Sequence, residues 1–263
     1  MPLGIPEKTG MFKKLVLCAA LAAAFVGSAS AEEKPLRMAT ESSYPPFEFF
    51  DAKTDSNVGF DVDLMKAIAK HMGRKLEIVP MGFDAIIPSL LTNTVDVGVS
   101  ALTITEERAK RLLFSTPYYE SGLSTLIRSE DKDKIKSIKD VENRTICVQI
   151  GTSGAIRAQE VPGATVKTFN TVAETFLELK NKGCDAVIGD RPVNAYFLTA
   201  RPQTAKDYYH LPERLNTELF GIGVKKSNTA LQKQINAALA AMKANGEYAA
   251  IYKKWFGEEP PKM

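Results

Sequence analysis

The chain has 263 residues, of which 44% are hydrophobic and 25% are charged, with 34 lysines and arginines against 31 acidic residues. This composition excludes a disordered or fibrous chain and is ordinary for a globular protein with one or two hydrophobic cores. The formal net charge of +3 is too small to predict a surface for nucleic acids or anionic membranes.

A secretory signal peptide is predicted near the start of the chain. From Met11 the sequence reads MFKKLVLCAALAAAFVGSASA, which is a basic start, an apolar stretch and a small-residue ending. We expect a signal peptide over 1–31, cleavage after Ala31 and a soluble periplasmic product, because the apolar stretch is short for the roughly 20 residues of a membrane span. Residues 1–10 do not fit a basic start, so we expect them to be an artefactual extension.

Strand-like and helix-like segments alternate through the rest of the chain. A helix is predicted over 61–72, where Leu64, Met65 and Ile68 fall on one stripe and Gly73 follows as a stop signal. Such alternation predicts an α/β protein whose parallel sheets are covered by helices. The strand-like runs lie at 36–41, 75–81 and 95–102 in a first set, and at 145–151, 164–169 and 184–190 in a second.

The two sets predict two α/β lobes joined by a two-strand hinge. Extended segments after Gly122 and near 220–226 would carry the chain from the first lobe to the second and back. We expect lobe 1 over 32–120, lobe 2 over 121–220 and a returning segment of lobe 1 over 221–263. Because ligands bind beyond the carboxyl ends of parallel strands, a ligand cleft is expected between the lobes.

Charged, polar and aromatic side chains follow the predicted strands at the expected cleft. The guanidinium of Arg108 is a fork of donors that grips a carboxylate at two points. Thr152 and Ser153 lie in a glycine-flanked turn before a helix and add donors for an anion, whereas Asp190 suits an ammonium. Together these groups complement a free amino acid. The full set is Glu41, Tyr44, Phe83, Thr103, Arg108, Thr152, Ser153 and Asp190.

Simpler interpretations of the same residues stay open from the sequence alone. Thr105 would cap a short helix whose solvated face carries Arg108. Asp190, which is followed by a proline-containing first turn, would cap another helix, and its local sequence by itself favours that role. Tyr44 and Phe83, taken singly, are more typical of a hydrophobic core than of a ligand platform.

Several short motifs follow one another along the chain: MATESSYPPFEF, VGFDVDLMKAIA, FDAIIPSL, ALTITEER, FSTPYYESG, VQIGTSG, DAVIGD and IYKKWFG. In order and spacing they resemble the extracellular solute-binding proteins, family 3, of ABC importers for polar amino acids. The resemblance covers about 36–257. It implies a type II periplasmic-binding fold, in which two lobes close over one amino acid and then deliver it to a membrane permease.

The resemblance also implies roles for the candidate residues. Arg108 would bind the α-carboxylate of the ligand. Its helpers would be Thr103, Thr152 and Ser153. Asp190 would bind the α-ammonium, assisted by Thr103 and by the backbone of Ala101. Arg108 and Asp190 would therefore hold the two charges that every free amino acid carries.

Specificity for the ligand side chain is implied by a further group of residues. Tyr44 and Phe83 would flank the side chain. Glu41 matches a position where members that take basic amino acids, and also a glutamine binder, carry an acid. Gln149 can bond either kind of polar tip, and Gly189 leaves room beside the ammonium site. Since histidine- and glutamine-preferring members carry lysine where Gln149 stands, we expect L-arginine or another basic amino acid, with glutamine as the alternative.

We expect a binding protein without catalysis, cofactor or metal. The only histidines of the mature chain, His71 and His210, do not follow predicted strands, and the sequence has no metal-spaced cysteine cluster. The alternative is an exported prephenate or arogenate dehydratase-like enzyme on the same fold, with Glu41 as its acid-base group. The expected partners are a small-molecule L-amino acid and an ABC transporter permease, without nucleic acid, and the resemblance implies a monomer.

Two cysteines, Cys147 and Cys184, remain after removal of the signal peptide, in a compartment that permits disulfides. The fold implied by the resemblance makes their strands neighbours, so the two residues would approach disulfide range. A pair of buried free thiols is an equally open alternative.

Overall fold

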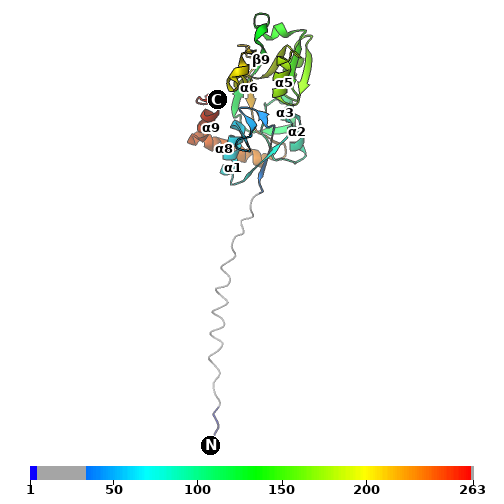
Figure 1. Ribbon diagram of the computed structural model, residues 1–263. Helices are drawn as coiled ribbons and strands as arrows, with labels where there is room; N and C mark the ends of the chain where they lie inside the picture. Colours follow the sequence, from blue (N-terminus) through cyan, green and yellow to red (C-terminus); the bar gives the residue numbers. More distant parts are fainter. Residues whose placement is uncertain (5–33, 262–263) are drawn as a thin grey trace. The chain divides into compact units, whose positions relative to one another are not determined.

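A computed structural model describes residues 1–4 and 34–261 of the protein. The predicted signal peptide and its cleavage position after Ala31 fall on residues that lie outside this description, apart from 1–4. Within the described ranges, no helix is long and apolar enough to cross a bilayer. Residues 34–261 contain two five-stranded sheets with helices around each, so the α/β fold class with two lobes is confirmed (Figure 1).

The first sheet is mixed. Its strands, in spatial order, are β5 (Leu76–Pro80), β1 (Leu36–Thr40), β6 (Val97–Gly98), β15 (Gly223–Lys225) and β7 (Leu112–Phe114). β1 lies parallel to both β5 and β6, with Met38 opposite Ile78 and Val97. β15 runs antiparallel to β6 and β7. The expected parallel arrangement therefore holds for β1, β5 and β6, whereas a late segment of the chain, β15, inserts antiparallel between two early ones.

Helices from both ends of the described chain pack in this first lobe. They are α1 (Phe60–His71), α2 (Phe83–Leu91), α3 (Glu106–Arg111), α8 (Thr229–Asn245) and α9 (Glu247–Phe256). Leu64, Met65 and Ile68 of α1 are fully buried, as their spacing predicted. Figure 1 shows α8 and α9, in orange to red, beside α1 in cyan. The Asp63 carboxylate of α1 accepts hydrogen bonds from Lys254 and from Trp255 of α9, at 2.6 and 2.8 Å.

The second sheet is mixed in the same way. Its strands, in spatial order, are β11 (Thr165–Phe169), β10 (Thr145–Gln149), β12 (Ala186–Asp190), β9 (Leu123–Arg128) and β13 (Tyr208–His210). β10 is parallel to β11 and β12, whereas β9 is antiparallel to β12 and β13. The segment after Gly122 is thus a central strand of this lobe.

Short helices cover the second sheet and connect its strands. They are α4 (Ser153–Gln159), α5 (Val172–Lys180), α6 (Arg191–Ala200), α7 (Pro202–Ala205) and the 3-10 turns η1 (Ser129–Asp131) and η2 (Ile138–Val141). Thr171 begins α5 with a capping box, in which its hydroxyl accepts from the Glu174 N–H and the Glu174 carboxylate accepts from the Thr171 N–H. α4 and α6 follow β10 and β12, so both begin at the edge of the sheet that faces the candidate site.

Two antiparallel strands connect the lobes. β8 (Tyr119–Ser121) pairs with β14 (Glu218–Phe220), with Ser121 opposite Glu218. The first crossing agrees with the predicted extended segment near Gly122. The second crossing strand, β14, begins two residues before the predicted segment 220–226. The later part of that segment is β15, which belongs to the first sheet.

A small antiparallel sheet of β2 (Ser43–Tyr44), β3 (Glu48–Asp51) and β4 (Ser56–Val58) lies in the chain between β1 and α1. Phe47, in its β2–β3 turn, is fully buried and packs edge-on against Phe60, Tyr119 and Phe220. Each such ring pair contributes on the order of 1 kcal/mol beyond its area burial. The aromatic cluster therefore joins the hairpin and α1 to both crossing strands.

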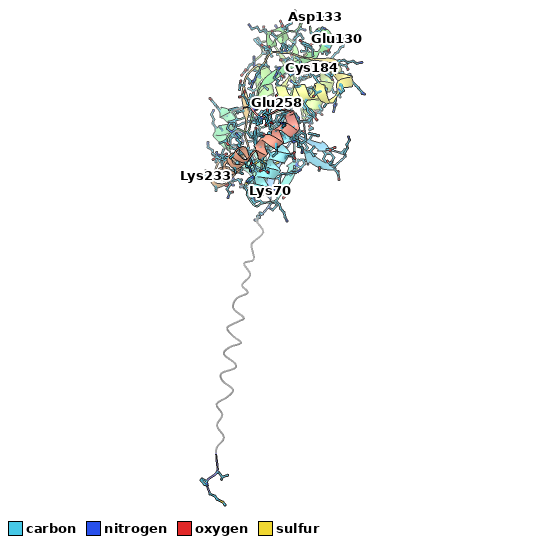
Figure 2. The ribbon with its side chains drawn as sticks, turned by 90° about the vertical axis from the view of Figure 1, so that its left-hand side faces the viewer. Lys70, Glu130, Asp133, Cys184, Lys233 and Glu258 are labelled. Atoms are coloured by element: carbon cyan, nitrogen blue, oxygen red, sulfur yellow. A yellow bond between two sulfur atoms is a disulfide. The ribbon has the colours of Figure 1, made fainter. Side chains whose placement is uncertain are left out.

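The two cysteines form a disulfide. Cys147 on β10 is bonded to Cys184, two residues before β12, and their Cα atoms are 6.0 Å apart. Figure 2 shows Cys184 in the second lobe, in the same part of the molecule as Glu130 and Asp133. Of the two alternatives that the sequence left open, the structure contains the bridge, which closes a loop with a sequence separation of 37 residues.

Candidate ligand-binding site

Arg108 is buried at the junction of the two lobes. Thr105 does cap α3, because its hydroxyl accepts the Arg108 N–H at 3.2 Å. The Arg108 residue is only 7% exposed, however, so the prediction of a solvated face is wrong for it. Its Nη1 donates to the Thr103 carbonyl at 2.7 Å, and its Nη2 donates to the Gly151 carbonyl of the second lobe at 3.0 Å. The guanidinium also lies 5.5 Å from the ring centre of Phe83.

The hydroxyls of Thr103 and Ser153 lie next to Arg108, one from each lobe. They are 3.4 Å apart, and both donate to the same carboxylate oxygen of Glu218, at 2.9 and 2.8 Å. Thr152 faces its own helix: its hydroxyl donates to the Gln149 carbonyl and accepts the Ala155 N–H. The structure therefore brings Ser153 and Thr103 together and uses the Thr152 hydroxyl as the cap of α4.

Glu218 is a member of this cluster that sequence reasoning missed. It is buried on the crossing strand β14, and its second carboxylate oxygen accepts from the Asn216 amide at 2.9 Å. The signal was present in the segment TELFGIG, where Glu218 and Phe220 share one face of a strand and Leu219 occupies the other. An acid on the face of a buried phenylalanine indicates a polar site inside the protein. Burial lowers the pKa of Arg108, and the charges of Glu218 and Asp190 oppose that effect.

Asp190 stands at the N-cap position of α6, but its side chain makes no capping hydrogen bond. One carboxylate oxygen accepts from the Tyr44 hydroxyl of the first lobe at 2.6 Å, and the other accepts from the Ser121 hydroxyl at 3.1 Å. Burial raises the pKa of Asp190 to about 7, and the charge of Glu218 adds to this effect. The structure thus favours the charged-site interpretation of Asp190 over the helix cap, and adds Ser121 as a neighbour that the sequence analysis missed.

Glu41 and Gln149 form a separate polar group. Glu41 is 6% exposed, and the Gln149 amide nitrogen lies 3.5 Å from one of its carboxylate oxygens. The Ser43 hydroxyl donates to the other oxygen, and the Gln149 amide also donates to the Asn170 carbonyl at 3.0 Å. Burial raises the pKa of Glu41, although the hydrogen bonds from Ser43 and Gln149 oppose this. Within residues 34–261, no lysine or arginine forms an ion pair with Glu41.

Ala101 and Phe83 complete the predicted set. Ala101 follows β6 with a positive φ of 45°, which is unusual for a residue with a Cβ, and its N–H donates to Asp61 at 2.7 Å. Phe83 is the first residue of α2 and is half-buried beside Arg108. The predicted residues therefore lie in one region, where strand ends of both lobes meet.

A small cavity of about 10 Å³ lies beside the Asp190 carboxylate, and Tyr44, Gln149, Thr152 and Gly189 also help to line it. A larger cavity of about 360 Å³ lies between the β2–β3 hairpin and the helices α5 and α6, and its walls are mainly apolar and aromatic. We place the candidate site beside the smaller cavity, between Asp190, which lines it, and the buried guanidinium of Arg108, because opposite buried charges recognise a zwitterion.

Neither histidine belongs to this region. His71 bonds Glu247 of α9, and His210 bonds the Ser124 hydroxyl, with a pKa that burial lowers to about 4. Among the described residues, no group of three or more histidine, cysteine, aspartate or glutamate side chains has the arrangement of a metal site. The arrangement supports binding of a small zwitterion by fixed donors and acceptors.

A family model for bacterial extracellular solute-binding proteins, family 3, matches residues 36–258. The chain belongs to this family. The family assignment inferred from the motifs is thus confirmed, and with it the function of an extracellular solute-binding protein.

Relatives of this solute-binding protein include ABC transporter arginine-binding protein 1 of Escherichia coli K12. It is 38% identical over 247 residues, which cover 93% of this chain and 99% of the relative. The ABC transporter glutamine-binding protein GlnH of Bacillus subtilis is 33% identical, with 95% of each chain covered. A solved structure of an ancestral arginine-binding protein bound to arginine superposes with a TM-score of 0.81 at 40% identity, and covers 86% of this chain and 100% of that one.

Proposed function

We propose that this solute-binding protein captures free L-arginine, or another basic L-amino acid, and passes it to the permease of an ABC importer. Arg108 would hold the α-carboxylate and Asp190 the α-ammonium. Glu41 and Gln149 would receive the cationic tip of the side chain, and Phe83 would pack against the ligand. These assignments rest on the burial and mutual positions of the groups, and on the relatives named for arginine.

The observation that carries the choice of ligand is Glu41, a buried acid without a cationic partner among residues 34–261. A buried carboxylate that stays ionised needs a positive partner or several donors, and it has the Ser43 hydroxyl and a long contact from Gln149. A guanidinium supplies both the charge and the paired donors. Glu41 therefore favours a basic side chain over a neutral one.

Glutamine is the second candidate. A carboxylate also accepts a hydrogen bond from an amide, and Gln149 keeps a carbonyl oxygen that has no partner in the described residues. The glutamine-binding relative from Bacillus subtilis supports this alternative. The two candidates differ in charge, so Glu41 contributes much more to arginine binding than to glutamine binding.

The test is a thermal-shift series on refolded protein. The mature chain is unfolded in denaturant to remove carried ligand, refolded, and its Tm is measured with each of the twenty L-amino acids at equal concentration. A ligand that binds only the folded state raises Tm by mass action. We expect arginine or lysine to give the largest rise. A largest rise with glutamine would transfer the assignment to the second candidate, and no rise with any amino acid would reject the proposal.

The remaining parts of the proposal concern partners and organisation. We infer a monomer with a signal peptide over 1–31, a first lobe over 32–120 and 221–263, and a second lobe over 121–220. Opening and closing would occur at the crossing strands β8 and β14. We propose that the protein is not an enzyme: incubation with prephenate or arogenate should give no product, and turnover of either compound would contradict this.

A further inference from the structure

Two acidic residues that the candidate site does not include are fully buried directly behind it. Glu48 on β3 and Asp61 on α1 are both 0% exposed. They are neighbours, because the Asp61 N–H donates to the carbonyl of Phe47, the residue before Glu48, at 2.9 Å, and the charge of Asp61 raises the pKa of Glu48. Two ionised carboxylates are both acceptors and repel each other, so a hydrogen bond between these neighbouring groups requires one proton. The oxygens Glu48 Oε2 and Asp61 Oδ1 have no hydrogen-bond partner among the described residues, so they are the atoms available for such a proton.

The outer oxygens of the two carboxyl groups reach the backbone of the candidate site. Asp61 Oδ2 accepts the N–H of Ala101 at 2.7 Å and the hydroxyl of Tyr118 at 2.9 Å. Glu48 Oε1 accepts the Ser100 hydroxyl at 2.5 Å, and the oxygen of that hydroxyl accepts the N–H of Glu41 at 3.1 Å. Each acid therefore holds the main chain of one residue to which we assign a ligand contact.

Ala101 shows why such support is needed. Its φ of 45° lies in the left-handed region, which costs a residue with a Cβ on the order of 1 kcal/mol. The short hydrogen bond from its N–H to Asp61 holds this conformation. The Ala101 backbone, to which the family resemblance assigns a role beside the ligand ammonium, has its position determined by the same peptide geometry.

We propose that Glu48 and Asp61 form a proton-sharing pair that positions Glu41 and Ala101 for the amino acid. This inference rests on the proposed function of the site. The two are positioning residues, since neither is assigned a contact with the ligand. One shared proton leaves the pair with a single negative charge behind the ammonium site, and loss of that proton would place two negative charges side by side in the interior.

The surroundings determine how the pair responds to pH. The titratable groups that act on it are Glu41, Tyr44, Tyr118 and Tyr248, and none of them is a cation. Burial raises the pKa of Glu48 well above its usual 4.5, and raises that of Asp61 from 3.8 to about 7. Since both folded-state pKa values lie above the unfolded ones, the pair contributes stability below about pH 4 that is lost as pH rises toward 7 and beyond.

Amide substitutions test the shared proton. In Glu48→Gln, the amide donates permanently to Asp61, while its oxygen still accepts from Ser100. In Asp61→Asn, the amide donates to Glu48, while its oxygen still accepts from Ala101. In the double variant, the hydrogen bond between the two amides requires one of them to turn its carbonyl oxygen toward the other. The NH2 group of that amide then faces Ser100 or Ala101, which loses its hydrogen-bond acceptor. We therefore expect each single variant to bind the preferred amino acid within about threefold of wild type, and the double variant to bind at least about tenfold more weakly.

Two ligand-free measurements accompany the binding data. The fall in unfolding free energy between pH 5 and pH 9 should be smaller in both single variants than in wild type, because the shared proton has been replaced. Hydrogen exchange at the amides of Ala101 and Glu41 should stay slow in the single variants and become at least about tenfold faster in the double variant. Both measurements test the proton-sharing pair without ligand. If wild type binds no amino acid, the proposed function fails, but these two measurements still decide whether the pair exists.

Asp96→Asn is the matched control. Asp96 lies in the same lobe, where it accepts two hydrogen bonds from the Arg37 side chain and one from the Arg37 backbone. It comes just before β6, whereas Ala101 comes after that strand. The Asp96→Asn variant should lower Tm without changing the dissociation constant of the amino acid or the hydrogen-exchange rates of the Ala101 and Glu41 amides. The inference is overturned if a single amide variant keeps the wild-type pH slope. It is also overturned if the double variant loses stability but retains wild-type affinity and slow exchange at both amides.

Discussion

The Arg108 end and the Asp190 end of the candidate site keep a buried charge in different ways. At the Arg108 end, the carbonyl oxygens of Thr103 and Gly151 hold the guanidinium at 2.7 and 3.0 Å, and they come from different lobes. Backbone carbonyls do not titrate, and a guanidinium stays protonated at any pH at which proteins remain folded. The positive end of the site is therefore permanently charged.

The Asp190 end depends on pH. The hydroxyls of Tyr44 and Ser121 donate to its carboxylate, yet burial still raises its pKa to about 7. Hydroxyl donors stabilise the charged form without supplying a positive charge, so they offset desolvation only in part. The comparison shows that Arg108 is charged at every relevant pH, whereas the ligand ammonium must help to ionise Asp190.

Substitution of Arg108 should have the largest effect, because it breaks the permanent end. Lysine keeps the charge but loses the planar fork that binds both carbonyls and the ligand carboxylate. We expect Arg108→Lys to weaken binding by on the order of 100-fold in calorimetric titrations. Arg128→Lys is the control, since Arg128 also donates to two backbone carbonyls, those of Leu179 and Cys184, away from the site. An unchanged dissociation constant for Arg108→Lys would remove this residue from the site.

The pH dependence tests the titratable end. Protonated Asp190 cannot attract an ammonium, so affinity should fall by on the order of tenfold as pH drops from 8 to 6. Asp190→Asn should bind weakly at both pH values, and any dependence that persists would belong to Glu41 or to the Glu48–Asp61 pair.

The stability of the ligand-free protein provides an independent check of the same group. The folded-state pKa of Asp190 lies above its usual 3.8, so its contribution to stability is present below that value and is lost as pH rises through about 7. Asp190→Asn should lack this loss in thermal unfolding scans. Equal affinities of wild type at pH 8 and pH 6 would show that Asp190 is not the ammonium partner.

Glu41 provides a smaller and more selective prediction, which separates the two candidate ligands. Glu41→Gln should weaken arginine binding by on the order of tenfold and change glutamine binding by less than about threefold, because only arginine loses an ion pair. Glu77→Gln, at an exposed acid on β5 of the same lobe, should change neither affinity. Equal losses for both ligands would contradict a basic side chain beside Glu41.

Glu218 should have the smallest effect on affinity, and it sharpens the comparison of the two ends. Its charge acts on both Arg108 and Asp190, and it raises the pKa of each. Glu218→Gln retains an acceptor for Thr103 and Ser153 but removes the charge. The midpoint of the pH profile of binding should then move down by less than about one unit. A midpoint that stays in place would mean that burial alone raises the pKa of Asp190.

The sequence predicted the elements better than their directions. The stripe of Leu64, Met65 and Ile68 placed α1 correctly to within one residue at each end, and the two sets of strand-like runs agree with the mutually parallel strands of both sheets. The antiparallel strands β9 and β15 were expected only as crossing segments. Alternating burial identifies a strand, but it carries no information about which neighbour the strand pairs with, or in which direction.

The candidate site shows the same limit for single residues. The motifs singled out Arg108 and Asp190, yet a helix face and a helix cap explained their local sequences equally well. In the structure Thr105 caps α3 while Arg108 is buried, so a local role and a tertiary role coexist in one short helix. Glu218 and Ser121 were missed because they lie on crossing strands, which no strand-end rule selects.

The sequence by itself determined the α/β class, the two lobes and the family, because these depend on local periodicity and on the order of motifs along the chain. Only the tertiary structure decided which charges are buried and which atoms satisfy them. Glu48, Asp61 and Glu218 look like ordinary surface acids in the sequence, and all three lie inside the protein. The physical reason is that desolvation and hydrogen bonding depend on residues distant in the chain, such as Ala101 for Asp61 and Thr103 for Glu218.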